Sequence, residues 1–205
     1  MRKKSDKAYE GKLHIRLLDR LEIIYGNQSV ETALKKSRKA RSLVSFLILN
    51  QGKPVSFSDI HRALWGNGDA ADLDNVLKVL VSRTRSMFVA VHPALRDCSM
   101  SQPGAYRWNM EMTAEVDVFE IEALCTELCQ GNALTEAGQK KLESLMCLYT
   151  GNLLPEEAET EWVKRFSSRL EEQFKSTVFH ALSLLHEKND AASIVKICRM
   201  GLATM

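Results

Sequence analysis

Small and polar side chains recur at helical spacing in one stretch of the first half of the chain. At 100° per residue, one side of a helix there carries Asn75, Val79, Ser82 and Ser86, with Lys78 and Arg83 flanking them. The amide of Asn75 has the donor and the acceptor that adenine matches in the major groove of DNA, and Lys78 or Arg83 can bind guanine or phosphate. This side of the helix therefore predicts contacts to double-stranded DNA.

The opposite side of the same helix is apolar. Its stripe consists of Leu77, Val81, Thr84 and Phe88. The stripe predicts a helix over about residues 71–88 that packs against a core. Arg85 lies near the edge of the stripe, so it could either contact a phosphate or pack against the protein. A solvated helix face that touches nothing would have the same spacing, so position alone does not decide between these interpretations.

The elements around this helix follow a definite order. Alternating residues predict strands, capping serines and 3.6-residue spacing predict helices, and a Pro-Gly turn predicts a β-hairpin. In chain order these are strands at 13–17 and 21–25, a helix after Ser37, a helix from Ser56 to Trp65-Gly66, the helix just described, and strands at 98–102 and 105–108 around Pro103-Gly104. This is the layout of an α+β winged helix-turn-helix, with a short antiparallel sheet, three helices and a C-terminal wing hairpin.

The second half of the chain is predicted to be helical throughout. Helices are expected at about 116–130, 135–150, 160–187 and 190–202, separated by breaks that contain Gly, Asn and Pro. Their order predicts an all-α domain of stacked helical hairpins. Little chain follows the last helix to cover its apolar residues, so we expect the domain to be truncated at its C-terminus.

The two halves also differ in charge. The chain has 28 Lys and Arg and 26 Asp and Glu. Up to Asn109 it has 19 basic and 10 acidic residues, a net charge of +9, and from Met110 on it has 9 basic and 16 acidic residues, a net charge of −7. A basic first half favours a polyanionic partner. The 205 residues are 45% hydrophobic and 26% charged, which excludes collagen-like and disordered chains. Apolar runs are far shorter than the roughly 20 residues of a membrane span, and no signal peptide follows the basic N-terminus, so the expected location is the cytoplasm.

Other kinds of chemistry have little support in the sequence. Five scattered cysteines, an odd number, predict reduced thiols and not a disulfide framework. Cys125 and Cys129 are four residues apart, but no second pair completes a zinc site, so core thiols are the simpler interpretation. The sequence has no glycine-rich phosphate-binding loop. Neither the order nor the spacing of its residues indicates a Ser-His-Asp or Cys-His catalytic set. We therefore expect no enzyme activity, no cofactor or metal, no small-molecule substrate and no membrane partner.

Several segments resemble one bacterial family. They are residues 38–43, 52–56, 63–66, 75–83 and 103–107 in the first half, and 116–118, 148–155 and 161–163 in the second. In order and spacing these segments resemble SARP-type (antibiotic regulatory protein) transcriptional activators. In that family an OmpR/PhoB-type winged helix precedes a tetratricopeptide-like bacterial transcriptional activation domain. The resemblance extends over nearly the whole chain from about Lys12.

The resemblance implies roles for particular residues. It assigns DNA contacts to Asn75, Lys78, Val79, Ser82, Arg83 and Arg85 on the recognition helix and to Arg107 on the wing, and we expect Arg38 and Arg41, with Lys35 and Lys36, to border the duplex. Gln102 departs from the family, whose wing often carries an arginine there, so we expect either weaker readout by the wing or a contact made by Arg96 or Arg107 instead. Asp69, Asp72 and Asp74 crowd the start of the recognition helix and repel phosphates, so we expect modest affinity from one copy.

The resemblance also implies domains and partners. Residues 1–11 would form a flexible basic tail, 12–109 the DNA-binding domain and 110–205 the activation domain. The chain would bind promoter repeats, form a homodimer on DNA and engage RNA polymerase, without catalysis. The alternative is a helical protein-interaction module whose winged helix contacts protein and not DNA.

Overall fold

The computed structural model describes residues 11–66, 73–130 and 133–204. Apart from Gly11, the predicted tail lies outside the described residues, and so do Asp69 and Asp72. The chain divides into two units, Met1–Ile15 with Leu21–Glu115 and Arg16–Arg20 with Val116–Met205. The short segment Arg16–Arg20 therefore belongs to the second unit, although the chain before and after it belongs to the first.

Of the helices that the structure describes in the first unit, the last three were predicted and the first was not; the last also continues three residues beyond its predicted end at residue 88. They are α1 (Glu31–Leu34), α2 (Arg38–Leu49), α3 (Phe57–Trp65) and α4 (Leu73–Val91). Ser37 Oγ accepts a hydrogen bond from the N–H of Ala40 at 3.3 Å, and Ser56 Oγ accepts one from the N–H of Asp59 at 3.1 Å, which confirms both predicted caps. Gly66 ends α3 with φ at +77°, a conformation that glycine adopts without strain.

Two small sheets accompany these helices. Strands β1 (Leu13–Arg16), β2 (Glu22–Tyr25), β3 (Gln28–Ser29) and β7 (Thr113–Val116) form one sheet in the order β3-β2-β1-β7, and β4 (Val55–Ser56), β5 (Ser99–Gln102) and β6 (Ala105–Trp108) form the other in the order β4-β6-β5. The predicted hairpin is confirmed, with Ser99 opposite Trp108 and Gln102 opposite Ala105. The sequence did not predict β3, β4 or β7, because strands of two to four residues carry too little alternation to stand out.

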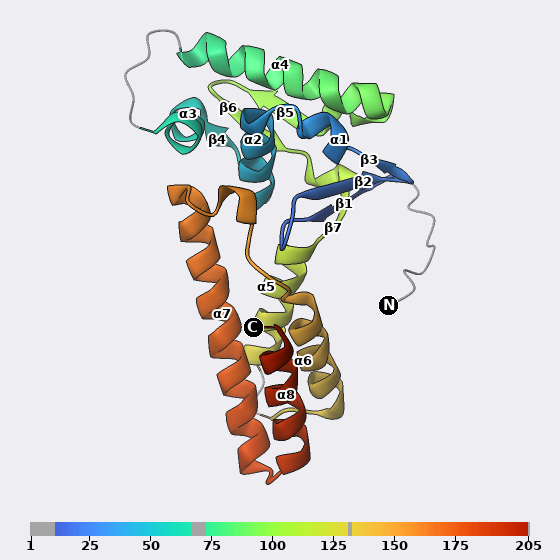
Figure 1. Cartoon of the computed structure of the whole chain (residues 1–205), viewed down its shortest axis with the longest axis vertical. Helices are drawn as coiled ribbons and strands as arrows, with labels where there is room; N and C mark the ends of the chain where they lie inside the picture. The colour runs from blue at the N-terminus through green and yellow to red at the C-terminus, as the bar shows by residue number, and fades with distance from the viewer. Residues whose placement is uncertain (1–10, 67–72, 131–132, 205) are drawn as a thin grey trace. The chain divides into compact units, whose positions relative to one another are not determined.

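One side of α4 is fixed in the core of the first unit. The predicted stripe is confirmed, since Leu77, Val81, Thr84 and Phe88 are all buried. The ring of Phe88 meets the edge of Trp108 on β6, with ring centroids 5.9 Å apart. Along its length α4 contacts α1, α2, α3 and the short 3-10 helix η1 (Pro93–Asp97) (Figure 1). Each buried apolar side chain of this size stabilises by about 1.5–3 kcal/mol, so the orientation of α4 is strongly determined.

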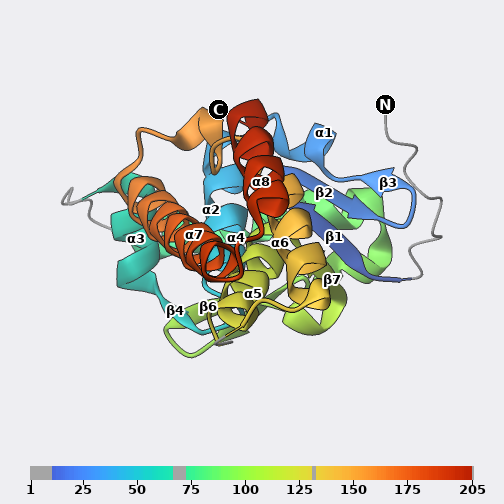
Figure 2. The same ribbon diagram turned by 90° about the horizontal axis from the view of Figure 1, so that it is seen from below.

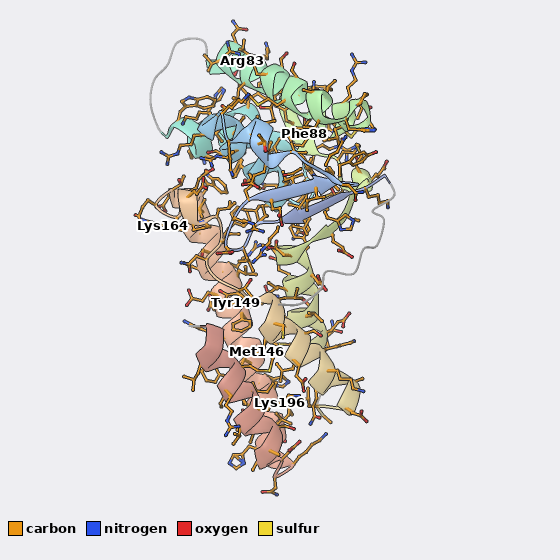
Figure 3. The ribbon with its side chains drawn as sticks, turned by 45° about the vertical axis from the view of Figure 1, so that its right-hand side comes forward. Arg83, Phe88, Met146, Tyr149, Lys164 and Lys196 are labelled. Atoms are coloured by element: carbon orange, nitrogen blue, oxygen red, sulfur yellow. The ribbon has the colours of Figure 1, made fainter. Side chains whose placement is uncertain are left out.

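The second unit is built from four helices in the part of the chain that the structure describes. They are α5 (Asp117–Cys129), α6 (Glu136–Leu148), α7 (Glu161–Glu187) and α8 (Ala191–Thr204), with a short 3-10 turn η3 (Pro155–Glu157) before α7. Helix α5 packs against α6 and α7, and α8 packs against the same two helices (Figure 2). Just after α6, Tyr149 stacks on Phe174 of α7 with ring centroids 4.0 Å apart (Figure 3). The predicted order of helices is confirmed, although the break expected at residues 131–132 lies outside the described residues.

The segment Arg16–Arg20 is held in the second unit by the first residue of α5. The carboxylate of Asp117 accepts hydrogen bonds from the backbone N–H groups of Leu17 and Leu18 at 2.9–3.0 Å. Leu18 also pairs with Leu153 in an isolated antiparallel bridge. Burial raises the pKa of Asp117 above its ordinary value, while these backbone donors and that of Val118 oppose the rise. One carboxylate thus joins two segments that are 100 residues apart.

The fold class predicted from the sequence is confirmed. A winged helix-turn-helix with small antiparallel sheets precedes a helical part. Among the described residues, no helix is both long enough and apolar enough to cross a bilayer.

Candidate DNA-binding surface

The outward side of α4 carries the side chains that the sequence placed there. Asn75, Lys78, Val79, Ser82, Arg83 and Ser86 are all exposed. Arg83 lies on the outer side of α4, whereas Phe88 lies on the side that faces the hairpin (Figure 3). Val76 is also exposed, to 47%, beside Val79 at 50%. Sequence reasoning missed Val76, although its spacing of three residues from Val79 was a signal that could have found it.

The cations on this side of α4 have no intramolecular partner among the described residues. Neither Lys78 nor Arg83 makes an ion pair or hydrogen bond there through its side chain. The hydroxyl of Ser86 donates to the carbonyl of Ser82 at 3.1 Å, so its own donor is engaged. Asp74, in the first turn, is exposed, and its Oδ1 lies 3.9 Å from Nε2 of His61. The surface therefore combines unpaired cations with small side chains.

Arg85 points to the other edge of α4 and is engaged by the wing. Its Nε donates to Ser99 Oγ at 3.2 Å, and its Nη2 donates to the carbonyl of Ser99 at 2.8 Å and to Ser101 Oγ at 2.9 Å. Both serines belong to β5. Of the two roles that the sequence left open, these contacts support packing, because the guanidinium joins the recognition helix to the hairpin.

A basic groove of about 780 Å³ runs beside α4. Its lining includes Lys78, Ser82, Arg85 and Ser86 from α4, Arg96 from η1 and Tyr106 from β6. Tyr106 is buried and stacks on Phe57 with ring centroids 5.1 Å apart, and burial raises its pKa, so the phenol stays neutral. Three cations thus border one concavity that is formed by α4, η1 and the hairpin. The sequence named Arg96 as a substitute for a wing arginine but did not predict the groove.

The predicted wing cation lies on β6. Arg107 is opposite Met100 of β5 and is half-buried, and its Nε is buried without a hydrogen-bond partner among the described residues. Gln102 is exposed at the end of β5, next to the turn, in which Gly104 has φ at +67°. The turn itself is open, since nothing lies within 4 Å of a Cβ placed on Gly104.

The cations expected to border the duplex lie around the start of α2. Arg38 and Lys36 are exposed and make no ion pair with described residues. Lys35 pairs with Glu31 at 2.9 Å, so its charge is partly compensated. Arg41 is half-buried and therefore less accessible to solvent than Arg38 and Lys36. Of the four predicted residues, Arg38 and Lys36 are therefore the most available to an external anion.

Metal-binding side chains do not cluster in the part of the chain that the structure describes. No group of three His, Cys, Asp or Glu side chains there could hold a metal ion. Cys125 is buried, as expected, but Cys129 is exposed and its Sγ lies 3.3 Å from Thr177 Oγ1. Burial raises the pKa of the Cys98 thiol to about 12, which keeps it protonated and unreactive.

Comparison with known proteins shows similarity to a family of regulatory proteins and to a solved structure. Residues 31–95 match the family described as "Transcriptional regulatory protein, C terminal". The fold resembles that of EmbR from Mycobacterium tuberculosis, in a structure with a low-affinity phosphopeptide, with a TM-score of 0.71 at 19% sequence identity. The similarity covers 91% of this chain and 49% of that one, so the chain spans about half the length of EmbR in that structure. No curated protein matches the sequence.

The family match covers α1 to α4 and most of η1, which includes the outward side of α4. The similarity to EmbR extends the agreement to a winged helix followed by helices. This is the organisation that the SARP-type resemblance implied. Over its winged helix the chain is therefore similar to the C-terminal domain of transcriptional regulatory proteins, and over nearly all of its length it has a fold similar to that of EmbR.

Proposed function

We propose that this chain regulates transcription by binding specific DNA sequences through its winged helix. The observation that carries the proposal is the outward side of α4, where Lys78 and Arg83 have no partner among the described residues while the opposite side is locked in the core. A rigid helix that shows small side chains and uncompensated cations has the shape and charge that the major groove requires. The basic groove beside α4 extends the same charge toward the phosphate backbone.

Each residue of the surface has a chemical role in this proposal. Asn75 and Ser82 read base edges, and Lys78 or Arg83 binds guanine or a phosphate. Arg38, Arg41 and Arg107 contact the backbone or the adjacent minor groove. Arg85 acts mainly as a positioning residue, because its guanidinium holds the hairpin at a fixed place beside α4.

The second unit is proposed to act as an activation domain. Residues 12–109 would bind DNA and residues 110–205, which contain most of the second unit, would engage RNA polymerase or a second protomer, with two copies on promoter repeats about one helical turn apart. The resemblance of segments 148–155 and 161–163 to bacterial activation domains supports this, as does the acidic charge of the second half. We place the protein in the cytoplasm and assign it no enzymatic activity.

The test is selection of bound fragments from a random DNA pool at physiological salt, followed by measurement of Kd against salt concentration. Binding that neutralises Z phosphates should give a slope of about −0.9Z for log K against log salt. Arg83→Ala should weaken binding to the recovered site. Lys140→Ala, which removes one exposed lysine from α6, is the matched control and should leave Kd unchanged.

The opposite outcome would favour the alternative function. If no motif is recovered, and if a complex with protein forms that is insensitive to salt and to Arg83→Ala, the winged helix contacts protein and not DNA. The exposed valines on α4 are the feature that such a partner would cover.

A further inference from the structure

Helix α4 exposes two valines on the side that the proposed function turns toward DNA. Val76 is 47% exposed and Val79 is 50% exposed. A single exposed valine needs no explanation. These two lie three residues apart, so their side chains are neighbours on the helix surface and form one small apolar patch. Asn75 lies one turn before Val79 and Arg83 one turn after it, so the patch, here called the valine pair, is in the middle of the candidate surface.

We propose that the valine pair binds the C5-methyl groups of thymines in the major groove and so selects thymine at one or two positions of the DNA site. This inference rests on the proposed function. The thymine methyl is the apolar group that base edges present in the major groove, where guanine and adenine offer polar atoms and cytosine an amino group. An exposed isopropyl group gains by covering a methyl group and loses by covering a polar one.

The side chain of valine suits this role because it is stiff. A β-branched side chain in a helix has one strongly preferred χ1 rotamer, so the methyl groups of Val76 and Val79 point in fixed directions before DNA binds. Little side-chain entropy is then lost in the complex. The helix beneath is equally fixed, because Leu77 and Val81 are buried on its other side. The valine pair is therefore organised in advance of binding.

The surrounding charges indicate DNA as the occupant. Lys78 and Arg83 flank the valine pair and make no ion pair with described residues, so an apolar protein partner would have to bury uncompensated cations. A duplex supplies the opposite charge next to the apolar methyl groups. Acidic Asp74 lies one turn before Lys78 and disfavours phosphates at that end of α4, which leaves base edges as the nearest surface. Val76 and Val79 are about 4.5 Å apart along the helix axis, which compares with the roughly 3.4 Å between base steps, so the two methyl groups should belong to neighbouring base pairs.

The test replaces thymine with deoxyuridine, which pairs identically but lacks the methyl group. The site recovered by selection is synthesised with each thymine replaced in turn, and Kd is measured for the full chain. Removal of a contacted methyl group should weaken binding about three- to five-fold. Val76→Ala and Val79→Ala should each weaken binding to the thymine site and remove most of the difference between thymine and deoxyuridine at one position. Alanine is compatible with an exposed helix position, so both variants should fold.

Val89→Ala is the matched control. Val89 is 38% exposed on the same helix, ten residues beyond Val79; it lines the basic groove but is not part of the valine pair, so its replacement should leave the full difference between thymine and deoxyuridine. The inference is wrong if every deoxyuridine site binds as tightly as the thymine site, or if the difference survives in both Val76→Ala and Val79→Ala. DNA binding and the proposed function would stand in either case. Failure to select any DNA would overturn the proposed function and this inference with it.

Discussion

The lysines and arginines of the two units differ in how many of them form ion pairs with acidic side chains. In the second unit, six of the nine that follow Val116 lie within 2.9 Å of a glutamate oxygen. These ion pairs are Lys140–Glu136, Lys141–Glu127, Lys164–Glu159, Arg169–Glu122, Lys175–Glu171 and Lys196–Glu143. On the candidate surface of the first unit, Lys78, Arg83 and Arg96 make no ion pair with the residues that the structure describes.

The difference concerns the availability of charge and not stability. Exposed ion pairs contribute only about 0–1 kcal/mol to folding, so the pairs of the second unit do little to hold it together. A lysine that is paired with a glutamate, however, adds little to the electrostatic potential around the protein. Uncompensated cations on one face produce a positive potential that attracts and orients an anion. The comparison therefore supports the proposal that the first unit binds a polyanion.

Reversal of a free charge should have the largest effect. Arg83→Glu removes an unpaired cation and adds a charge that repels phosphate, so we expect the affinity for DNA to fall at least ~100-fold, or about 2.7 kcal/mol. Lys140→Glu makes the same change at a paired lysine of α6 and should change the affinity less than about two-fold. Fluorescence anisotropy with the selected site measures both variants. Equal losses would show that the pairing of a cation does not decide its role.

Removal of Arg85, a cation of the candidate surface that has hydrogen-bond partners, should lower the stability of the fold more directly than it lowers the affinity for DNA. Arg85→Ala breaks the hydrogen bonds to Ser99 and Ser101, and we expect the free energy of unfolding to fall by about 1–3 kcal/mol. Urea denaturation measures this, and Arg83→Ala should change it by less than about 0.5 kcal/mol. If Arg85→Ala left stability intact and still weakened DNA binding, Arg85 would be a direct DNA contact.

The paired lysines should show only weak coupling to their partners. Lys140 and Glu136 are four residues apart on α6, and Lys140 Nζ lies 2.9 Å from Glu136 Oε1. A double-mutant cycle with alanine should give a coupling energy of about 0.3–0.5 kcal/mol for this pair. The coupling should shrink toward zero at high salt, because both side chains are exposed. A coupling well above about 1 kcal/mol would mean that the pairs of the second unit are structural and that the contrast between the units is also one of stability.

The smallest effect concerns a carboxylate at the start of α8. Hydrogen bonds from Ser193 Oγ at 2.7 Å and from the Ser193 N–H at 3.1 Å lower the pKa of Asp190 below its ordinary value. A lowered pKa in the folded state means that the contribution to stability is present above the pKa of the unfolded chain and is lost as the pH falls through that of the folded state. Urea midpoints measured from about pH 6 to 2 should therefore fall more for the unchanged chain than for Asp190→Asn. Identical profiles would show that Asp190 does not contribute to the pH dependence.

Much of the fold could be predicted from local sequence. Ser37 and Ser56 cap their helices where the sequence placed them, and the helices of the second unit begin and end within a few residues of prediction. Both sides of α4 were also predictable, because the 3.6-residue period assigns each side chain to a side once Leu77 is buried. The contact partners of those side chains were not predictable, since the sequence left both a phosphate contact and a packing role open for Arg85.

Local sequence alone specified the longer helices, the caps at Ser37 and Ser56, the buried stripe of α4 and the exposed residues opposite it, because these depend on neighbours three or four positions away. Tertiary structure alone decided that β4 joins the hairpin, that β7 joins the N-terminal sheet, that Asp117 holds Leu17 and Leu18 in the second unit and that Ser99 and Ser101 engage Arg85. These contacts join residues that are 14 to 100 positions apart or strands too short to show a period. Pairing over such distances depends on the assembled core and leaves no repeat in the chain that could reveal it.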